Sequence, residues 1–159
     1  MRGMRARWQS GRAGTGPVIR ICIMTFIDNL ALLCGRILLA VLFLPAGVRK
    51  LMDLGGTAAY MTRMGVPAPD VMALVAGAVE VSLPILLLIG VFPRVVAVLA
   101  GGFVVVATLT AHRFWEFAEP AQQMMQQTQF LKNLGLIGGT MFYFVAGAGA
   151  FSVGGRARR

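Results

Sequence analysis

Four long apolar stretches dominate this chain. They cover residues 30–48, 71–90, 95–111 and 130–149, each about 17–20 residues long. At ~1.5 Å per residue, a helix of that length crosses a ~30 Å hydrocarbon core. Lipid offers the backbone no hydrogen-bond partner, so every amide in such a stretch must pair within its own helix. The sequence therefore predicts an all-α protein, a transmembrane four-helix bundle.

The composition excludes the competing fold classes. The chain is 57% hydrophobic and only 13% charged, whereas roughly a quarter of the residues of a soluble domain are charged. The apolar stretches are continuous, as over residues 37–44, and do not alternate as the strands of an outer-membrane barrel do. One bundle uses the whole length, and a second domain does not fit.

The net charge of +9 lies in the ends of the chain and in short loops. Basic segments beside a membrane set topology and contact anionic lipid, so we expect the lipid bilayer, and not nucleic acid, as the partner of these cations. We divide the chain into a basic N-terminal tail (residues 1–27, expected to be disordered), a membrane domain (28–153) and a basic C-terminal tail (154–159). Met24 is an alternative start, which would make the N-terminal tail an over-extension.

Four spans place both termini on one side of the membrane. That side then carries nine lysines and arginines against five on the other, so the positive-inside rule predicts that both termini are cytoplasmic. If the chain starts at Met24, the side with the termini carries four lysines and arginines and the other side five. The positive-inside rule then predicts no orientation. Between the first two spans we expect a short interfacial helix over residues 55–64, and between the next two a tight turn at Phe92-Pro93-Arg94.

Two ionisable residues stand out inside the spans, Arg36 in the first and Glu80 in the second. A charge in the hydrocarbon region costs roughly 2.5–3.5 kcal/mol even on the mild insertion scales. Both residues lie at similar depths, so we predict that they meet as a buried ion pair. Two interpretations remain open: the pair only locks two helices together, or it forms the polar floor of a site for a ligand or a proton.

A second polar set lies at the opposite ends of the helices. If the four helices pack as a bundle, this set converges above Glu80 as the rim of a pocket. Its members are Lys50, His112, Gln129, Lys132 and Asn133. A pocket with an apolar floor and a polar rim suits an amphipathic molecule with carbonyl oxygens, such as a quinone. Taken singly, Lys50 and Lys132 are also explained by snorkelling to lipid head groups, and His112 by capping a helix.

The glycines, cysteines and single histidine indicate helix packing rather than a redox or metal centre. Gly135 and Gly139 form a G-x-x-x-G motif, which we assign to helix packing inside the bundle. The cysteines, Cys22 and Cys34, do not form the C-x-x-C pair that disulfide exchange needs, which excludes a thiol oxidoreductase. The single histidine argues against a built-in metal or haem site, so we expect no metal.

The order of several segments resembles the DoxX family of membrane proteins. The segments that carry the resemblance are Gly35-Arg36-Ile37-Leu38-Leu39-Ala40, Ala58-Ala59-Tyr60-Met61, Ala76-Gly77-Ala78-Val79-Glu80, His112-Arg113-Phe114-Trp115 and residues 129–139. The resemblance covers residues 30–153 and implies a four-helix protein of the bacterial inner membrane. The family takes its name from a subunit of a thiosulfate:quinone oxidoreductase, and some members are linked to oxidative-stress complexes. Its family-like positions include most of the polar set above: Arg36, Lys50, Glu80, His112, Lys132 and Asn133.

Two functions from different classes follow. The first is a quinone-interacting membrane subunit without a covalently bound cofactor, which serves a soluble or membrane partner that carries the redox centre. If the chain takes part in catalysis, it does so as an accessory subunit of a quinone-linked oxidoreductase. The alternative is a non-catalytic scaffold or assembly protein whose buried Arg36 and Glu80 only specify helix packing. Transport by a homo-oligomer is a weaker third function, since no inverted repeat supports it.

Overall fold

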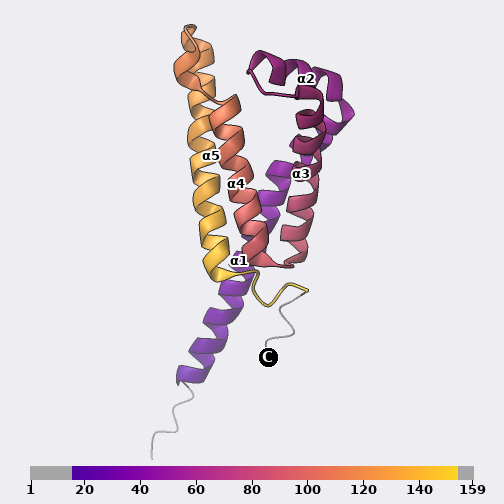
Figure 1. The fold of residues 1–159 in the computed structure, drawn as a ribbon. Helices are drawn as coiled ribbons and strands as arrows, with labels where there is room; N and C mark the ends of the chain where they lie inside the picture. The colour runs from indigo at the N-terminus through magenta and orange to yellow at the C-terminus, as the bar shows by residue number, and fades with distance from the viewer. Residues whose placement is uncertain (1–15, 154–159) are drawn as a thin grey trace, which may run out of the picture.

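The computed structural model describes residues 16–153, with side chains from Phe26 onward. Within these residues the protein is all-helical (Figure 1). Its elements are α1 (Gly16–Met52), α2 (Leu54–Arg63), α3 (Pro69–Ile89), α4 (Pro93–Ala111), the 3₁₀-helix η1 (Phe114–Glu116) and α5 (Pro120–Ala146). The predicted helix over residues 55–64 is thus confirmed as α2. Asp53 caps it, because its side chain accepts a hydrogen bond from the Gly56 amide at 2.9 Å.

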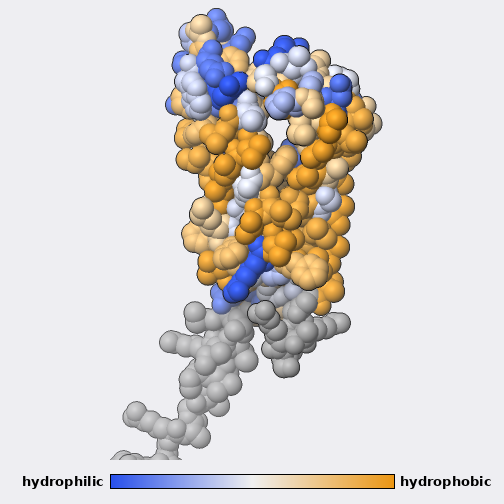
Figure 2. Space-filling model, in the orientation of Figure 1, coloured by the Kyte–Doolittle hydropathy of each residue, from blue (hydrophilic) through white to orange (hydrophobic). Residues whose placement is uncertain are grey.

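Three helices in the described part of the chain are long and apolar enough to cross a membrane. They are α1 from Phe26 to Met52, α3, and α4 extended to Glu116. Figure 2 shows the matching apolar band, with hydrophilic residues gathered at the end of the molecule that carries α2. The fourth predicted span lies within α5, which has 27 residues but is not among the three. Its first half carries several glutamines, Lys132 and Asn133, which lower its hydropathy.

The long helices are arranged as two pairs. α1 packs along α3 and α4 packs along α5, while α2 covers the start of α3; Figure 1 shows the two pairs side by side. Two glycines set the close approach of α1 and α3. A Cβ at Gly47 would lie 2.8 Å from the backbone carbonyl carbon of Glu80, and one at Gly77 would lie 2.6 Å from Leu51.

The predicted packing role of Gly135 and Gly139 is wrong for this chain on its own. A Cβ added at either position would meet no atom within 4 Å. In the same pair of helices, the close contact instead involves Gly101, where a Cβ would lie 2.8 Å from the Thr140 hydroxyl oxygen. α5 is therefore rotated so that its glycine motif points away from α4.

The C-terminal segment contacts α1 near Asn29 at the end of the bundle opposite α2, while the start of α1 extends beyond the bundle (Figure 1). The segment after α5 turns back, and the Val153 amide donates to the Ile89 carbonyl at 3.0 Å. The Ala150 amide donates to the Asn29 side chain at 2.5 Å. The expectation of a disordered tail over residues 1–27 needs correction, since α1 is helical from Gly16. Residues 1–15 and 154–159 lie outside the described residues.

Candidate functional site

Arg36 and Glu80 are both buried, with exposed fractions of 1% and 8%, but the predicted ion pair between them is wrong. Glu80 instead accepts a hydrogen bond from the Lys50 ammonium, with 2.5 Å between Nζ and Oε2. The reason is the crossing of α1 and α3. Gly47 lies against Glu80, and Lys50 follows it by one helical turn. Arg36 precedes Gly47 by ~16 Å along the helix axis, beyond the reach of Glu80.

Arg36 has a structural role at the other end of α3. Its guanidinium donates to the Leu88 carbonyl at 3.1 Å and to the Phe151 carbonyl at 2.5 Å. Leu88 belongs to the last turn of α3, where backbone carbonyls lack partners within the helix. Arg36 therefore joins α1 to the end of α3 and to the C-terminal segment. Two of its guanidinium nitrogens donate to carbonyls, while its buried Nε has no hydrogen-bond partner among the described residues.

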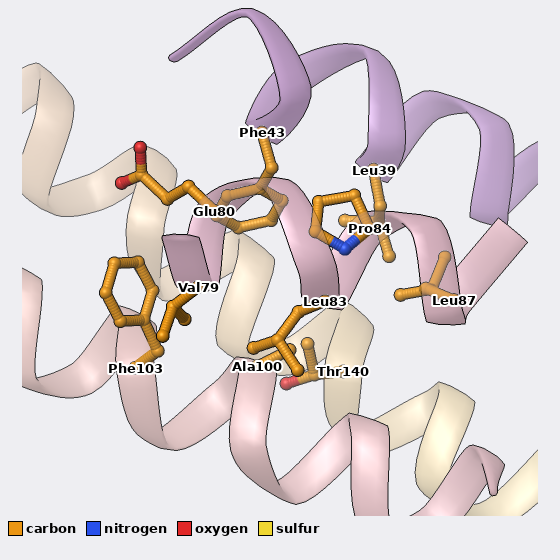
Figure 3. A pocket seen from close by; sticks show the side chains of 10 residues that line it. All are labelled: Leu39, Phe43, Val79, Glu80, Leu83, Pro84, Leu87, Ala100, Phe103 and Thr140. Atoms are coloured by element: carbon orange, nitrogen blue, oxygen red, sulfur yellow. The ribbon is translucent and has the colours of Figure 1, made fainter. Parts of the chain in front are cut away.

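A narrow apolar slot lies between the two helix pairs, with a cavity volume of about 10 Å³. Its described lining is contributed by α1, α3, α4 and α5 and consists of Leu39, Phe43, Val79, Glu80, Leu83, Pro84, Leu87, Ala100, Phe103 and Thr140. Figure 3 shows the Glu80 carboxylate at one end of this slot and Leu87 at the other. Of these side chains only Glu80 is ionisable, so the slot is a hydrophobic cavity with one acidic group at its end.

A polar cleft lies on the other side of the ion pair, where α1 meets α2. It has a volume of about 310 Å³ and is open to the surface. Its described lining is Ala46, Arg49, Lys50, Asp53, Gly56, Thr57 and Tyr60. Lys50 lines the polar cleft and Glu80 lines the apolar slot, so their ion pair is the point where the two cavities approach each other. An amphipathic molecule with its polar group at this pair would place its apolar body toward the slot, which would have to widen to hold it.

The remaining predicted rim residues do not line either of these two cavities. His112 Nδ1 lies 2.8 Å from the Gln126 side-chain oxygen, and the Asn133 amide donates to the Thr108 hydroxyl at 2.9 Å. Both contacts join α5 to the end of α4. Lys132 donates to Gln129 on an exposed face. The predicted polar ring is thus divided between the two helix pairs, and only Lys50 belongs to the site.

Sequence reasoning missed two polar residues near this end of the bundle. Gln126 is 8% exposed, although the glutamine run to which it belongs reads as a solvated surface. Tyr60 donates to the Ala111 carbonyl at 3.2 Å, and Arg113 donates to the Met64 carbonyl at 2.8 Å. These two bonds connect the α2 region to the end of α4. Tyr60 lies in a segment that carries the family resemblance, and that was the one available signal.

Comparison with known proteins agrees with this architecture. A family model described as DoxX matches residues 31–113, more than half of the chain. The inner membrane protein YphA of Escherichia coli (strain K12) is 31% identical over 122 residues, which are 77% of this chain and 86% of the relative. The inner membrane protein YqjF of the same organism is 32% identical over 133 residues, or 82% of this chain and 94% of the relative. No solved structure matches the chain.

Proposed function

The chain belongs to the DoxX family and is a bacterial inner-membrane protein, and on this premise we propose that it is a quinone-binding membrane subunit. In this proposal the electrons come from a partner that carries the redox centre. The observation that carries the proposal is the partly buried Lys50–Glu80 pair at the end of the apolar slot. Within the described residues this pair places an ionisable group beside an apolar slot. The slot has a volume of only about 10 Å³, so a quinone ring would enter it only when the two helix pairs move apart.

The chemistry of the pair suits the polar part of a quinone. The Lys50 ammonium has three donors and uses one on Glu80, so it has donors left for a carbonyl oxygen. Reduction of a quinone to a quinol takes up two electrons and two protons. Glu80 is the group of the slot that can hold and pass on a proton, and Lys50 exposes 30% of its side chain toward the water side. The apolar ring and tail would lie among Leu39, Leu83 and Phe103.

We further propose that α5 crosses the bilayer as a fourth span and that α2 lies at the membrane boundary. Helix α5 has 27 residues, enough for ~40 Å at ~1.5 Å per residue. It packs along α4, which is itself long and apolar enough to span. Asn133 is buried against Thr108, and the long Lys132 side chain can extend to the head groups. These contacts remove most of the cost of the polar residues in its first half.

The test uses the full chain in mild detergent with a short-chain quinone analogue. A ligand that binds only the folded protein raises the melting temperature, so we expect the analogue to raise the Tm of the wild type. Phe103→Trp fills the slot and should remove the rise, whereas Phe142→Trp, at a position that is 79% exposed, should preserve it. Glu80→Gln keeps an acceptor for Lys50 and should fold, but should weaken the effect of the analogue.

The proposal is wrong if the analogue leaves the Tm of the wild type unchanged and no quinone copurifies with it. That outcome would favour the second candidate, a non-catalytic scaffold. One observation supports the scaffold: Glu80 is neutralised by Lys50 and Arg36 by two carbonyls, so neither charge requires a ligand. Mass spectrometry of the quinones and proteins that copurify in mild detergent would identify the partner in either case.

A further inference from the structure

The polar cleft between α1 and α2 carries two charges that the fold does not pair. Lys50 is already bound to Glu80. Among the described residues, neither the Arg49 guanidinium nor the Asp53 carboxylate forms an ion pair, although both line the same cleft. Oxygen Oδ1 of Asp53 accepts the capping bond from Gly56, and Oδ2 accepts no hydrogen bond in the described part of the chain. The cleft therefore presents one free cation and one free anion.

The depth of the cleft identifies the environment of these charges. The apolar span of α1 ends at Met52, so Arg49 lies in its last turn and Asp53 follows it directly. This is the level of the lipid head groups, where arginine contacts phosphate. An arginine alone would attract any anionic lipid. A carboxylate in the same cleft disfavours a purely anionic head group and favours one that also carries a cation.

We propose that this cleft is a binding site for the zwitterionic head group of an amino phospholipid. Arg49 donates to the phosphate oxygens, and Asp53 accepts hydrogen bonds from the primary ammonium group. Both are charge-assisted contacts, the stronger class of hydrogen bond. The cleft has a volume of about 310 Å³, at the lower end of the range of roughly 300–1,000 Å³ of small-molecule sites. This site is distinct from the quinone slot and does not depend on the proposed function.

The experiment measures lipid retention by native mass spectrometry of the full chain. The detergent-solubilised protein is titrated with phosphatidylethanolamine, phosphatidylcholine or phosphatidylglycerol with identical acyl chains. We expect the wild type to retain phosphatidylethanolamine preferentially, because the trimethylated head group of phosphatidylcholine cannot donate to Asp53 and phosphatidylglycerol has no ammonium group. Arg49→Gln should lower this retention roughly 10-fold, the effect of losing one hydrogen bond to a charged group.

Asp53→Asn is the sharper variant, because asparagine still caps α2 and only the charge is lost. It should abolish the preference for phosphatidylethanolamine over phosphatidylglycerol without a change in helix content by circular dichroism. Arg63→Gln and Asp70→Asn are the matched controls, since both residues lie at the same end of the molecule but do not line the cleft. Both controls should retain the lipid as the wild type does.

Three results would overturn the proposal: equal retention of the three lipids by the wild type, an unchanged preference in Asp53→Asn, or an equal loss in the control variants. Soluble glycerophosphoethanolamine serves as a competitor. If it displaces the lipid at low concentration, the site recognises the free head group rather than the lipid in its membrane, which also contradicts the assignment. Phe103→Trp should leave lipid retention unchanged, because Phe103 lines the slot and not the cleft. Loss of quinone binding and loss of lipid binding can therefore be told apart by separate measurements.

Discussion

Buried charges in this protein are satisfied by whichever partner the helix crossing brings within reach. The depth of Arg36 and Glu80 could be predicted from their positions in the apolar stretches, and both side chains are indeed buried. The depth of a residue in the membrane does not determine which side chain it contacts. The choice of partner depends on where α1 crosses α3, and that crossing is set by Gly47 against Glu80. No motif in the sequence marks Gly47, so the pairing of Glu80 with Lys50 could not be predicted.

The pairing of Glu80 can be measured with two double-mutant cycles. We expect Lys50→Gln and Glu80→Gln to be coupled by on the order of 1–3 kcal/mol in the free energy of unfolding, since the pair is a partly buried, charge-assisted hydrogen bond. Arg36→Gln and Glu80→Gln share no contact, and their effects should add within about 0.5 kcal/mol. The free energies would come from reversible unfolding in mixed micelles. A larger coupling for Arg36 than for Lys50 would contradict the contacts described here.

At the scale of the elements, prolines and apolar stretches predict the helices well. The predicted spans over residues 71–90 and 95–111 correspond to α3 (Pro69–Ile89) and α4 (Pro93–Ala111). Each begins with proline in its first turn, a position where the missing amide hydrogen is no loss. Helix α5 starts ten residues before the predicted span, because a run of glutamines continues the helix without contributing to its hydropathy.

The rotation of each helix about its axis could not be predicted from the sequence. A G-x-x-x-G motif shows that close packing is sterically allowed, and not that a neighbour is present. Gly135 and Gly139 face open space, whereas the isolated Gly47 and Gly77 lie against α3 and α1. The neighbour of a helix face is decided by the packing of all four long helices, which a local motif does not encode.

This difference predicts opposite effects for two similar substitutions. In Gly47→Ala the new Cβ would lie 2.8 Å from the backbone of Glu80, which must shift, so we expect a loss of roughly 1–3 kcal/mol in the free energy of unfolding. In Gly139→Ala the new Cβ meets nothing within 4 Å. Alanine favours helix by about 0.5–1 kcal/mol over glycine, so this variant should be unchanged or more stable. A marked loss in Gly139→Ala would mean that a second chain packs on this face.

At the scale of the whole molecule, two helix pairs are joined mainly at their ends. Opposite α2, the turn from α3 to α4 and a cluster that includes Leu87, Val96 and Tyr143 hold the pairs together. At the α2 end, the hydrogen bonds of Tyr60 and Arg113 connect them. The slot lies between these connections. Because the slot has a volume of only about 10 Å³, a ligand can enter it only if the two pairs move apart between these joints.

The same arrangement fixes which parts of the chain lie at the same end of the bundle. Asn29 and Ala150 are in contact, so the start and the end of the membrane domain lie at one end, together with the turn that carries Arg94. The other end carries α2, η1 and the start of α5. The positive-inside rule places the first end in the cytoplasm when the arginines of the N-terminal tail are counted. The predicted orientation in the membrane therefore depends on whether the N-terminal tail is part of the protein.

Cysteine labelling in cells tests this orientation. Cys22 and Cys34 are first replaced by serine, and a single cysteine is then introduced by Gln123→Cys, in the first turn of α5, or by Ala157→Cys, in the C-terminal tail. A membrane-impermeant maleimide should label Gln123→Cys in intact spheroplasts, because that end faces the periplasm in the predicted topology. Ala157→Cys should react only after the membrane is permeabilised. The reverse pattern would show that the arginines of the N-terminal tail do not direct insertion, and labelling of both sites in intact spheroplasts would contradict an even number of spans.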